Sequence, residues 1–293
     1  GTDKTPLDKR PLFFPRFHQL DVVRKLLADV QERGVGRKYL IQHSAGSGKS
    51  NSITWAAYQL IDAASNDLSV PGARPDAMPL FDSVIVVTDR TVLDKQLRDN
   101  IKQFGQVAGV VVHAERSADL KVALESGKRI IITTIQKFPY ILDSIGSMDG
   151  KQFAIIIDEA HSSQTGTTAA KMNAALGDVF SSEDSDDDVS AQDFILAHIR
   201  KRKMLNSASY FAFTATPKES TLERFGEKKD DGTFKPFHLY SMRQAIEEGF
   251  ILDVLNNYTR YQSYYQIQKS IDDNPMFDSD RAQRKLKAFV ERN

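Results

Sequence analysis

Short runs of consecutive apolar residues recur along the chain, and segments with helical spacing of apolar residues separate several of them. A run without polar alternation predicts a strand that is buried on both faces, as the strands of parallel sheets are. The predicted strands are residues 38–41, 84–87, 130–133, 154–157 and 210–213. Their alternation with helices predicts an α/β fold, with a mainly parallel central sheet and helices on both faces.

The first predicted helix runs from Arg16 to about Glu32, with one apolar face made of Leu20, Val23, Leu27 and Val30. A second follows Lys49 and keeps helical spacing at Ile53, Ala57, Leu60, Ile61 and Ala64, and two more are predicted at 93–104 and 118–124. Residues 65–80 are rich in turn-forming types and predict a surface loop. The acidic run at 181–188 is interpreted as a solvated, mobile loop in preference to an acidic docking site.

Composition narrows the function classes. The 293 residues are 41% hydrophobic, contain no cysteine, and carry 39 basic and 39 acidic side chains. Without cysteine there can be no disulfides and no zinc–thiolate sites, so a reducing cytoplasm is the expected location. No run approaches the ~18 apolar residues that span a bilayer, so no membrane partner is expected. The balanced charge predicts that any DNA contact is local, through particular loops.

A glycine-rich loop lies between the predicted strand at 38–41 and the helix after it. The loop consists of Ser44, Ala45, Gly46, Ser47, Gly48, Lys49 and Ser50. Backbone N–H groups in such a loop, with the positive end of the following helix, bind phosphate oxygens. Lys49 is expected to reach the β- and γ-phosphates of ATP, and the Ser50 hydroxyl to bind Mg²⁺. His43 stands where the common pattern has its first glycine, and a glycine turn that merely caps a helix is the alternative.

Two adjacent carboxylates, Asp158 and Glu159, follow the apolar run at 154–157. They should therefore lie at the carboxyl edge of a sheet, the edge that lines the ligand crevice in open α/β folds. Asp158 suits a Mg²⁺ ligand, and Glu159 suits a general base that acts on the attacking water. The alternative is a pair of solvated turn carboxylates. Lys49, Asp158 and Glu159 are the predicted catalytic residues, expected to converge on one nucleotide.

Five further residues carry weaker signals. The Gln19 amide, with Arg16 before it, matches the hydrogen-bonding edge of adenine, although such a pair is most often a surface feature. Thr214 and Thr216 end another predicted strand at the same edge, and their hydroxyls could hydrogen-bond His161 or Glu159. They would then report the state of the γ-phosphate. A plain histidine and a strand-terminating turn are the alternatives.

Taken in order, six segments of the chain resemble motifs Q, I, Ia, Ib, II and III of superfamily 2 helicases and translocases. The segments are 16–19, 43–50, 88–97, 133–138, 158–161 (a DEAH box) and 213–217. With Ser163-Gln164 and the stretch Arg243–Val254, they resemble more narrowly the motor (R) subunit of type I restriction endonucleases. That family also has histidine at the position of His43. The resemblance covers about residues 10–258.

The resemblance implies a RecA-like P-loop domain that uses ATP and Mg²⁺ to translocate double-stranded DNA. It also implies partners, the methyltransferase and specificity subunits of a restriction-modification complex. In such a motor Gln19 reads adenine, and Thr214 and Thr216 couple the nucleotide to DNA. The implied contacts to strand phosphates, made through backbone and hydroxyl groups of two loops, are Thr88, Arg90, Thr133, Thr134 and Lys137.

The resemblance also implies the domain boundaries. Residues 1–15 form a lead-in, 16–255 a first RecA-like motor domain with a mobile acidic insertion at about 178–192, and 256–293 a linker or helix. A second motor domain and a nuclease domain are expected to lie outside the chain. Because the second domain supplies arginines to the ATP site in this family, we expect the chain alone to bind ATP weakly and hydrolyse it poorly.

Two alternatives to the restriction motor stay open. One is another superfamily 2 DNA helicase or remodeller-type ATPase, against which the stretch Arg243–Val254 counts. The other is a binding module in which ATP only orders a docking surface. Lys49, Asp158 and Glu159 argue against that module, because a protein that only binds ATP could lose the base.

Overall fold

The structure is a computed structural model of the chain and describes residues 14–88, 111–114, 116–158 and 205–253. The predictions for 93–104, the acidic insertion at 178–192 and the linker at 256–293 lie outside these residues. The strands are β1 (Lys38–His43), β2 (Ser83–Thr88), β3 (Val111–His113), β4 (Ile130–Thr134), β5 (Phe153–Ile157), β6 (Ala208–Thr214), β7 (Glu227–Lys228), β8 (Phe234–Lys235) and β9 (His238–Tyr240). The helices are α1 (Phe17–Arg33), α2 (Lys49–Leu60), α4 (Ser117–Glu125), α5 (Phe138–Gly146), α8 (Glu219–Phe225) and α9 (Met242–Glu247), with short 3₁₀ turns at Pro75–Ala77 and Ile135–Lys137.

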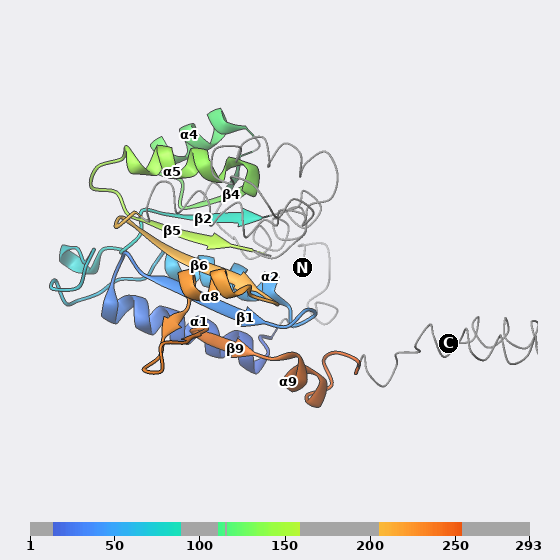
Figure 1. The fold of residues 1–293 in the computed structure, drawn as a ribbon. Helices are drawn as coiled ribbons and strands as arrows, with labels where there is room; N and C mark the ends of the chain where they lie inside the picture. Colours follow the sequence, from blue (N-terminus) through green and yellow to red (C-terminus); the bar gives the residue numbers. More distant parts are fainter. Residues whose placement is uncertain (1–13, 89–110, 115, 159–204, 254–293) are drawn as a thin grey trace, which may run out of the picture.

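Seven of the strands form one sheet in the order β3-β4-β2-β5-β6-β1-β9, and all of its pairings are parallel (Figure 1). β7 and β8 pair separately as a short antiparallel ribbon. Each predicted strand is present, extended by one to three residues at its ends. The α/β prediction with a parallel sheet is therefore confirmed. None of the helices in the described residues is long and apolar enough to cross a membrane.

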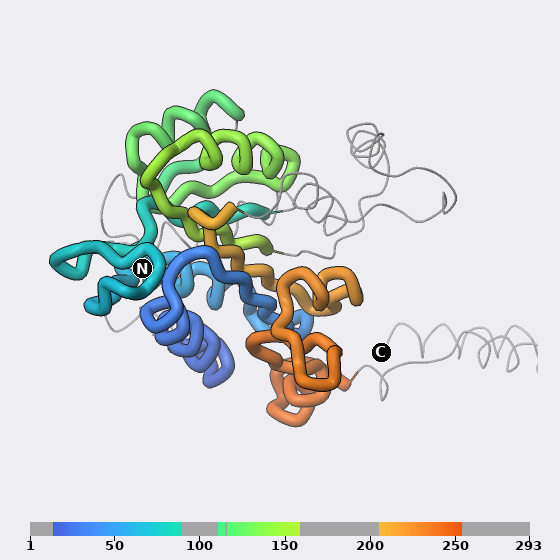
Figure 2. Tube along the Cα trace, turned by 60° about the vertical axis from the view of Figure 1, so that its left-hand side comes forward, coloured from blue at the N-terminus to red at the C-terminus, as the bar shows by residue number. Residues whose placement is uncertain are grey.

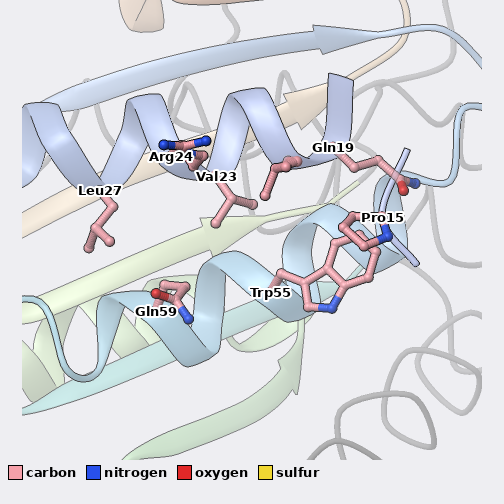
Figure 3. Close-up of a pocket in the computed structure, with 8 residues that line it drawn as sticks. Pro15, Gln19, Val23, Arg24, Leu27, Trp55 and Gln59 are labelled. Atoms are coloured by element: carbon pink, nitrogen blue, oxygen red, sulfur yellow. The ribbon is translucent and has the colours of Figure 1, made fainter. Parts of the chain in front are cut away.

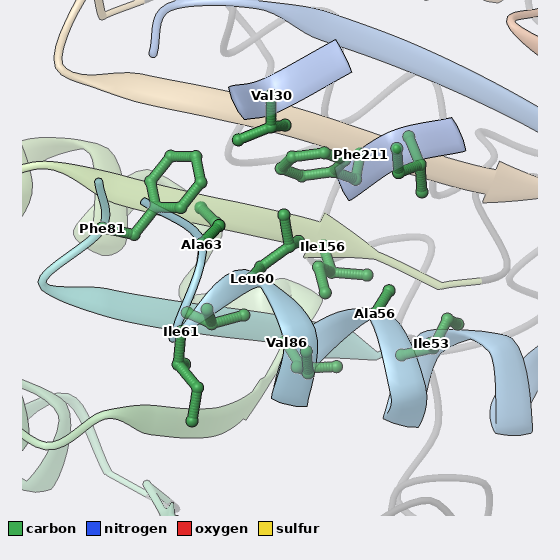
Figure 4. Close-up of a cluster of buried hydrophobic side chains, with 14 of the residues drawn as sticks. Val30, Ile53, Ala56, Leu60, Ile61, Ala63, Phe81, Val86, Ile156 and Phe211 are labelled. Atoms are coloured by element: carbon green, nitrogen blue, oxygen red, sulfur yellow. The ribbon is translucent and has the colours of Figure 1, made fainter. Parts of the chain in front are cut away.

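Helices cover both faces of the sheet, as the strand pattern predicts. Alternate strand residues point to opposite faces, so each buried strand contributes side chains to a hydrophobic core on each face of the sheet. On one face α4, α5 and α8 pack over Ile85, Ile131 and Ile155. On the other, α1 and α2 pack over Val86, Ile156 and Phe211 (Figure 4). The tube view shows α4 and α5 on the side of the sheet away from α1 (Figure 2).

Helix α1 differs from its prediction in the face that it buries. Val22, Val23, Leu26 and Val30 face the core, whereas Leu20 is 41% exposed and Leu27 is partly buried. The helix is confirmed. Its apolar residues, however, cover a wider face than the part that packs on the sheet. The exposed part of this face borders a groove beside α2.

The parallel arrangement brings the carboxyl ends of the strands to one edge of the sheet. β1 ends at His43, β6 at Thr214 and β5 at Ile157. In the register, Gln42 lies opposite Thr214, and Ile157 lies opposite Ala212. The segments that follow these strands therefore leave the sheet side by side, which is where open α/β sheets bind ligands.

Candidate functional site

The glycine loop connects the end of β1 to the start of α2, as predicted. Gly46 and Gly48 adopt left-handed conformations, with φ of 75° and 77°. Gly48 is also the N-cap of α2, and a Cβ built on it would lie 2.5 Å from the amide nitrogen of Gln19. Glycine is therefore required at 48 for two reasons, its backbone conformation and the close approach of a buried side chain.

The polar groups of this loop suit an anion. The hydroxyls of Ser44 and Ser47 are buried and have no hydrogen-bond partner among the described residues. Lys49 is 7% exposed, and its Nζ donates to the Ser44 carbonyl at 3.5 Å. Buried hydroxyls usually have partners, so two orphaned ones beside an ammonium group fit a site that phosphate oxygens would complete. Ala45 at the tip is exposed and Ser50, in the first turn of α2, is partly buried.

Gln19 lies against this loop, and its amide is largely used within the protein. Its nitrogen donates to the carbonyls of Ser47 and Gly48, both at 3.1 Å, and its oxygen accepts from the Arg16 N–H at 2.9 Å. Both amide hydrogens are thereby engaged, and the oxygen keeps one lone pair. In this arrangement Gln19 can accept a hydrogen bond from adenine but cannot donate one, which is half of the predicted match. The Arg16 guanidinium lies 4.0 Å from the centre of the Phe250 ring.

A histidine next to Gln19 contacts the same loop carbonyl. His18 is 2% exposed, and its Nε2 lies 3.0 Å from the Ser47 oxygen. Its ring stacks on Tyr240 of β9, with centroids 3.7 Å apart and planes 11° apart. The Tyr240 hydroxyl donates to Glu248 at 2.7 Å, and burial followed by this bond raises the pKa of Tyr240 to about 12. The tyrosine therefore stays protonated and keeps donating at neutral pH.

A second histidine group lies behind the start of the loop. His43 Nε2 is 2.8 Å from His238 Nδ1, and His238 Nε2 is 2.9 Å from an Asp21 carboxylate oxygen. Burial lowers the pKa of His43 to about 2, helped by the charges of its neighbours. Burial also lowers the pKa of His238, against the pull of the Asp21 carboxylate. The Asp21 carboxylate can only accept, and each neutral ring has one N–H. His238 therefore donates to Asp21, and His43 donates to His238.

Asp158 follows β5 at the same sheet edge as the loop. It is 4% exposed, and its N–H donates to the Val87 carbonyl at 2.9 Å. One strand, β6, separates β5 from β1, so at a spacing of ~4.8 Å per strand the two segments lie about 10 Å apart. Glu159 and His161 lie outside the described residues. Among the described residues no group of three or more His, Cys, Asp or Glu side chains could hold a metal. One carboxylate, a serine hydroxyl and phosphate oxygens are nevertheless a common Mg²⁺ ligand set.

The remaining predicted residues differ in how exposed they are. Thr214 is fully buried at the end of β6, next to the loop strand, whereas Thr216 is exposed. Thr88 and Thr133 are also buried, at 1% and 0% exposure, and their hydroxyls donate to the carbonyls of Thr133 and Ala114.

The hydroxyls of Thr88 and Thr133 are closed into the sheet, which disfavours the hydroxyl part of the predicted phosphate contact at these two residues. Thr134 is partly buried and accepts a hydrogen bond from Lys137 at 3.2 Å, so these two lie where a phosphate could approach. Arg90 lies outside the described residues.

A groove of about 280 Å³ opens between α1 and α2, beginning at Gln19 (Figure 3). Its lining is mostly apolar and consists of Pro15, Gln19, Leu20, Val23, Arg24, Leu27, Trp55 and Gln59. The sequence pattern pointed to Leu20 and Leu27 as core residues. Here they line an open surface next to the predicted base-reading residue.

Several residues of the site carry no recognisable signal in the sequence. His18, Asp21, His238 and Tyr240 are ordinary residues on a helix and on a short edge strand, and their partners are far away in the chain. The stretch Arg243–Val254 stood out by resemblance, but not as a packing neighbour of the loop. Ile251 in this stretch lies close enough that a Cβ on Gly46 would come within 2.9 Å of it.

Two curated proteins are similar in sequence to this chain. The chain is 24% identical over 278 residues to the SsaAORF53P type I restriction enzyme endonuclease subunit of Staphylococcus saprophyticus, and the match covers 93% of this chain and 24% of that protein. It is 27% identical over 228 residues to the putative MjaIXP type I restriction enzyme endonuclease subunit of Methanocaldococcus jannaschii, covering 74% of this chain and 16% of that one. The chain thus spans a quarter or less of the length of these relatives.

Solved structures with loose similarity include the SWI2/SNF2 ATPase core of Sulfolobus solfataricus in complex with double-stranded DNA. It is 16% identical, with a TM-score of 0.43 over 72% of this chain and 34% of that one. A nuclease-deletion mutant of the type ISP restriction-modification enzyme LlaGI, bound to a DNA substrate mimic, is 14% identical. Its TM-score is 0.45 over 96% of this chain and 24% of that one.

The sequence model of the SWI2/SNF2 ATPase matches residues 18–181, which is more than half of the chain. The match begins at His18, includes the glycine loop, and extends past the carboxylates at 158–159. The match therefore includes the glycine loop and Asp158 but not β9 or Thr214, and it shows that the chain belongs to the SWI2/SNF2 ATPase family.

Proposed function

We propose that this chain is the ATP-binding and ATP-hydrolysing motor domain of a type I restriction enzyme, and that it drives translocation of double-stranded DNA. The observation that carries the proposal is the glycine loop, with two left-handed glycines and two orphaned serine hydroxyls, at the sheet edge that also bears Asp158. Membership of an ATPase family supports the nucleotide. The names of the relatives support the restriction system.

Each residue near the nucleotide then has a role. ATP, with Mg²⁺ neutralising its phosphates, supplies the phosphoryl group whose transfer to water provides free energy for movement. The N–H groups of the loop and the Lys49 ammonium bind the phosphates, as buried donors at a helix N-terminus do. The Ser50 hydroxyl and the Asp158 carboxylate hold the metal. Glu159 is proposed as the base that orients the attacking water and takes its proton.

The base of the nucleotide is proposed to lie at the Gln19 end of the groove between α1 and α2. The free lone pair of the Gln19 oxygen would accept from the exocyclic amine of adenine. Trp55 and the apolar residues of the groove offer the flat, apolar surface that a purine prefers. Arg16 is proposed to stabilise this end through its contact with Phe250.

The DNA contacts are proposed to be non-specific and made to phosphates. Of the predicted residues, Thr134, Lys137 and Arg90 remain candidates, while the buried Thr88 and Thr133 are left out. Thr214, Thr216 and His161 are proposed to link the nucleotide to these contacts. Methyltransferase and specificity subunits are the proposed partners in a cytoplasmic complex.

The proposal is tested with the full-length protein that carries this chain, assembled with its partner subunits. On a DNA with a recognition site and a distant triplex, ATP should drive triplex displacement in the wild type. Lys49→Ala should abolish displacement and slow ATP hydrolysis at least ~100-fold, because the phosphate charge loses its ammonium partner. Lys121→Ala, on the exposed surface of α4, is the matched control and should behave as the wild type. Displacement by Lys49→Ala at the control rate would overturn the proposal.

A remodeller-type ATPase outside restriction systems is the second candidate, and the SWI2/SNF2 family match favours it over a strand-separating helicase. The two differ in their partners. Co-purification of the full-length protein with a DNA methyltransferase supports the restriction motor. An assembly without a methyltransferase, with DNA translocation intact, supports the remodeller-type enzyme.

A further inference from the structure

The direction of the loop N–H groups depends on where the loop carbonyls point. In a trans peptide the C=O and the following N–H point in opposite directions. The Ser47 carbonyl accepts from His18 at 3.0 Å and from Gln19 at 3.1 Å, both on the α1 side of the loop. A carbonyl held on that side sends the N–H of Gly48 to the other side. Two donors on one oxygen therefore fix one peptide plane at the left-handed turn of the loop.

His18 is equipped to donate this bond at every pH near neutrality. Burial is the main cause that lowers its pKa; the hydrogen bond to the Ser47 carbonyl opposes this, and the Arg16 charge lowers the pKa further. A neutral imidazole has one N–H, and the Ser47 carbonyl requires that hydrogen on Nε2. Nδ1 is then bare, in agreement with its having no hydrogen-bond partner among the described residues.

Tyr240 fixes the position of the His18 ring and also of the start of the loop. Its own ring stacks flat on His18, 3.7 Å away between centroids. Its backbone carbonyl accepts from the Ser44 N–H at 3.0 Å, which continues the pairing of β1 with β9. One residue of an edge strand thus braces both ends of the loop, and the histidine chain from His43 through His238 to Asp21 anchors that strand.

We propose that His18, held flat against Tyr240, is a positioning residue of the phosphate loop that turns the Gly48 N–H toward the bound phosphates. His18 does this by keeping the Ser47 carbonyl on the far side of the loop, and it touches no nucleotide itself. The same geometry makes β9 part of the nucleotide-binding unit, although it is the last of the described strands in sequence and is far from the loop along the chain. The nucleotide readout of this inference rests on the proposed ATP site.

Two substitutions separate the donor from the ring. His18→Phe keeps an aromatic ring for Tyr240 and removes the N–H. His18→Gln gives up the stacked ring but places an amide Nε2 at the same distance along the side chain as the imidazole Nε2. His113→Phe, on β3 at the other end of the sheet, is the matched control for the chemical change. All variants are made in the 293-residue chain and first compared by thermal unfolding.

Two readouts are taken, calorimetric titration with Mg·ADP and hydrogen–deuterium exchange of the peptide that covers residues 44–52. His18→Phe should weaken Mg·ADP binding about fivefold, as the loss of one hydrogen bond does, and should speed exchange in this peptide. His18→Gln should stay within about twofold of the wild type in both readouts, and so should His113→Phe. This pattern supports a positioning role, because a purely structural role would follow the ring and not the donor.

The inference is overturned if folded His18→Phe matches the wild type, or if His18→Gln is as impaired as His18→Phe. A wild-type chain that binds no Mg·ADP contradicts the proposed ATP site instead. In that case the exchange comparison still decides the inference, since it needs no nucleotide. Unchanged exchange in His18→Phe would then overturn it.

Discussion

The two ends of the carboxyl edge of the sheet use polar side chains in different ways. At the β1 end, His18, Gln19 and Tyr240 reach from other elements to hold a loop that has left the sheet. At the β2–β4 end, Thr88 and Thr133 donate to carbonyls of neighbouring backbone within the sheet. The first arrangement leaves serine hydroxyls for a ligand, and the second closes the edge. A polar residue at a strand end is therefore evidence for a ligand site only when the backbone after the strand leaves the sheet and polar groups there lack protein partners.

The largest effect that can break this comparison is expected at Gly48. Gly48→Ala should cost about 3 kcal/mol of unfolding free energy, because the Cβ is strained at φ 77° and collides with Gln19. Nucleotide binding should be lost with it. Gly127→Ala is a matched control, with φ of 67° and open space around it, and should cost only about 1 kcal/mol. Urea unfolding of both variants measures the difference, and equal costs would show that Gln19 does not press on the loop.

The next effect is a pH dependence caused by His43. Its pKa is about 2 in the folded chain and 6.5 when unfolded, so between these values the unfolded chain binds the extra proton. The free energy of unfolding should therefore fall as the pH drops below about 6.5. At about pH 5 the loss from His43 alone is about 2 kcal/mol.

His43→Gln isolates this contribution, since its amide keeps a donor for His238 and does not titrate. His18 and His238, whose pKa values are also lowered by burial, contribute in the same direction in both proteins. Urea unfolding at about pH 7.5 and about pH 5 should show a stability loss about 2 kcal/mol smaller in the variant. Parallel losses in the two proteins would mean that His43 is not buried as a neutral base.

The smallest effects are expected at the β2–β4 end. Thr133→Val removes one internal hydrogen bond and should cost about 1 kcal/mol of stability without affecting DNA binding. Lys137→Ala should leave stability unchanged, weaken DNA binding a few-fold, and lower the salt dependence of binding by about one phosphate contact. Urea unfolding and salt-dependent DNA titrations of the full-length protein measure both. A Thr133→Val variant with impaired DNA binding and unchanged stability would reverse the roles assigned to the two ends.

The sequence predicted the strands and the glycine loop because both are local signals. An apolar run such as Ala154–Ile157 marks a buried strand directly, and Gly48 before Lys49 marks the start of a helix. The sheet edge on which the loop and Asp158 lie followed from the parallel arrangement alone.

The support behind the loop could not be predicted in this way. His18 and Tyr240 lie near opposite ends of the described chain, and no periodicity pairs a helix residue with a residue on a distant edge strand. The burial of Thr88 and Thr133 could not be predicted either, because a motif match gives the residue type at a position but not how exposed its side chain is. Leu20 was misplaced, since α1 borders both the core and an open groove and this side chain is 41% exposed.

The central claim is that the glycine loop and Asp158 surround one Mg·ATP. A crystal structure of the chain with Mg²⁺ and a non-hydrolysable ATP analogue tests it most directly. The account predicts phosphate oxygens within hydrogen-bond distance of the N–H groups of Gly46 to Ser50, with Mg²⁺ on the Ser50 hydroxyl and linked to Asp158 directly or through one water. A nucleotide bound elsewhere, or a metal that neither residue approaches, would contradict it.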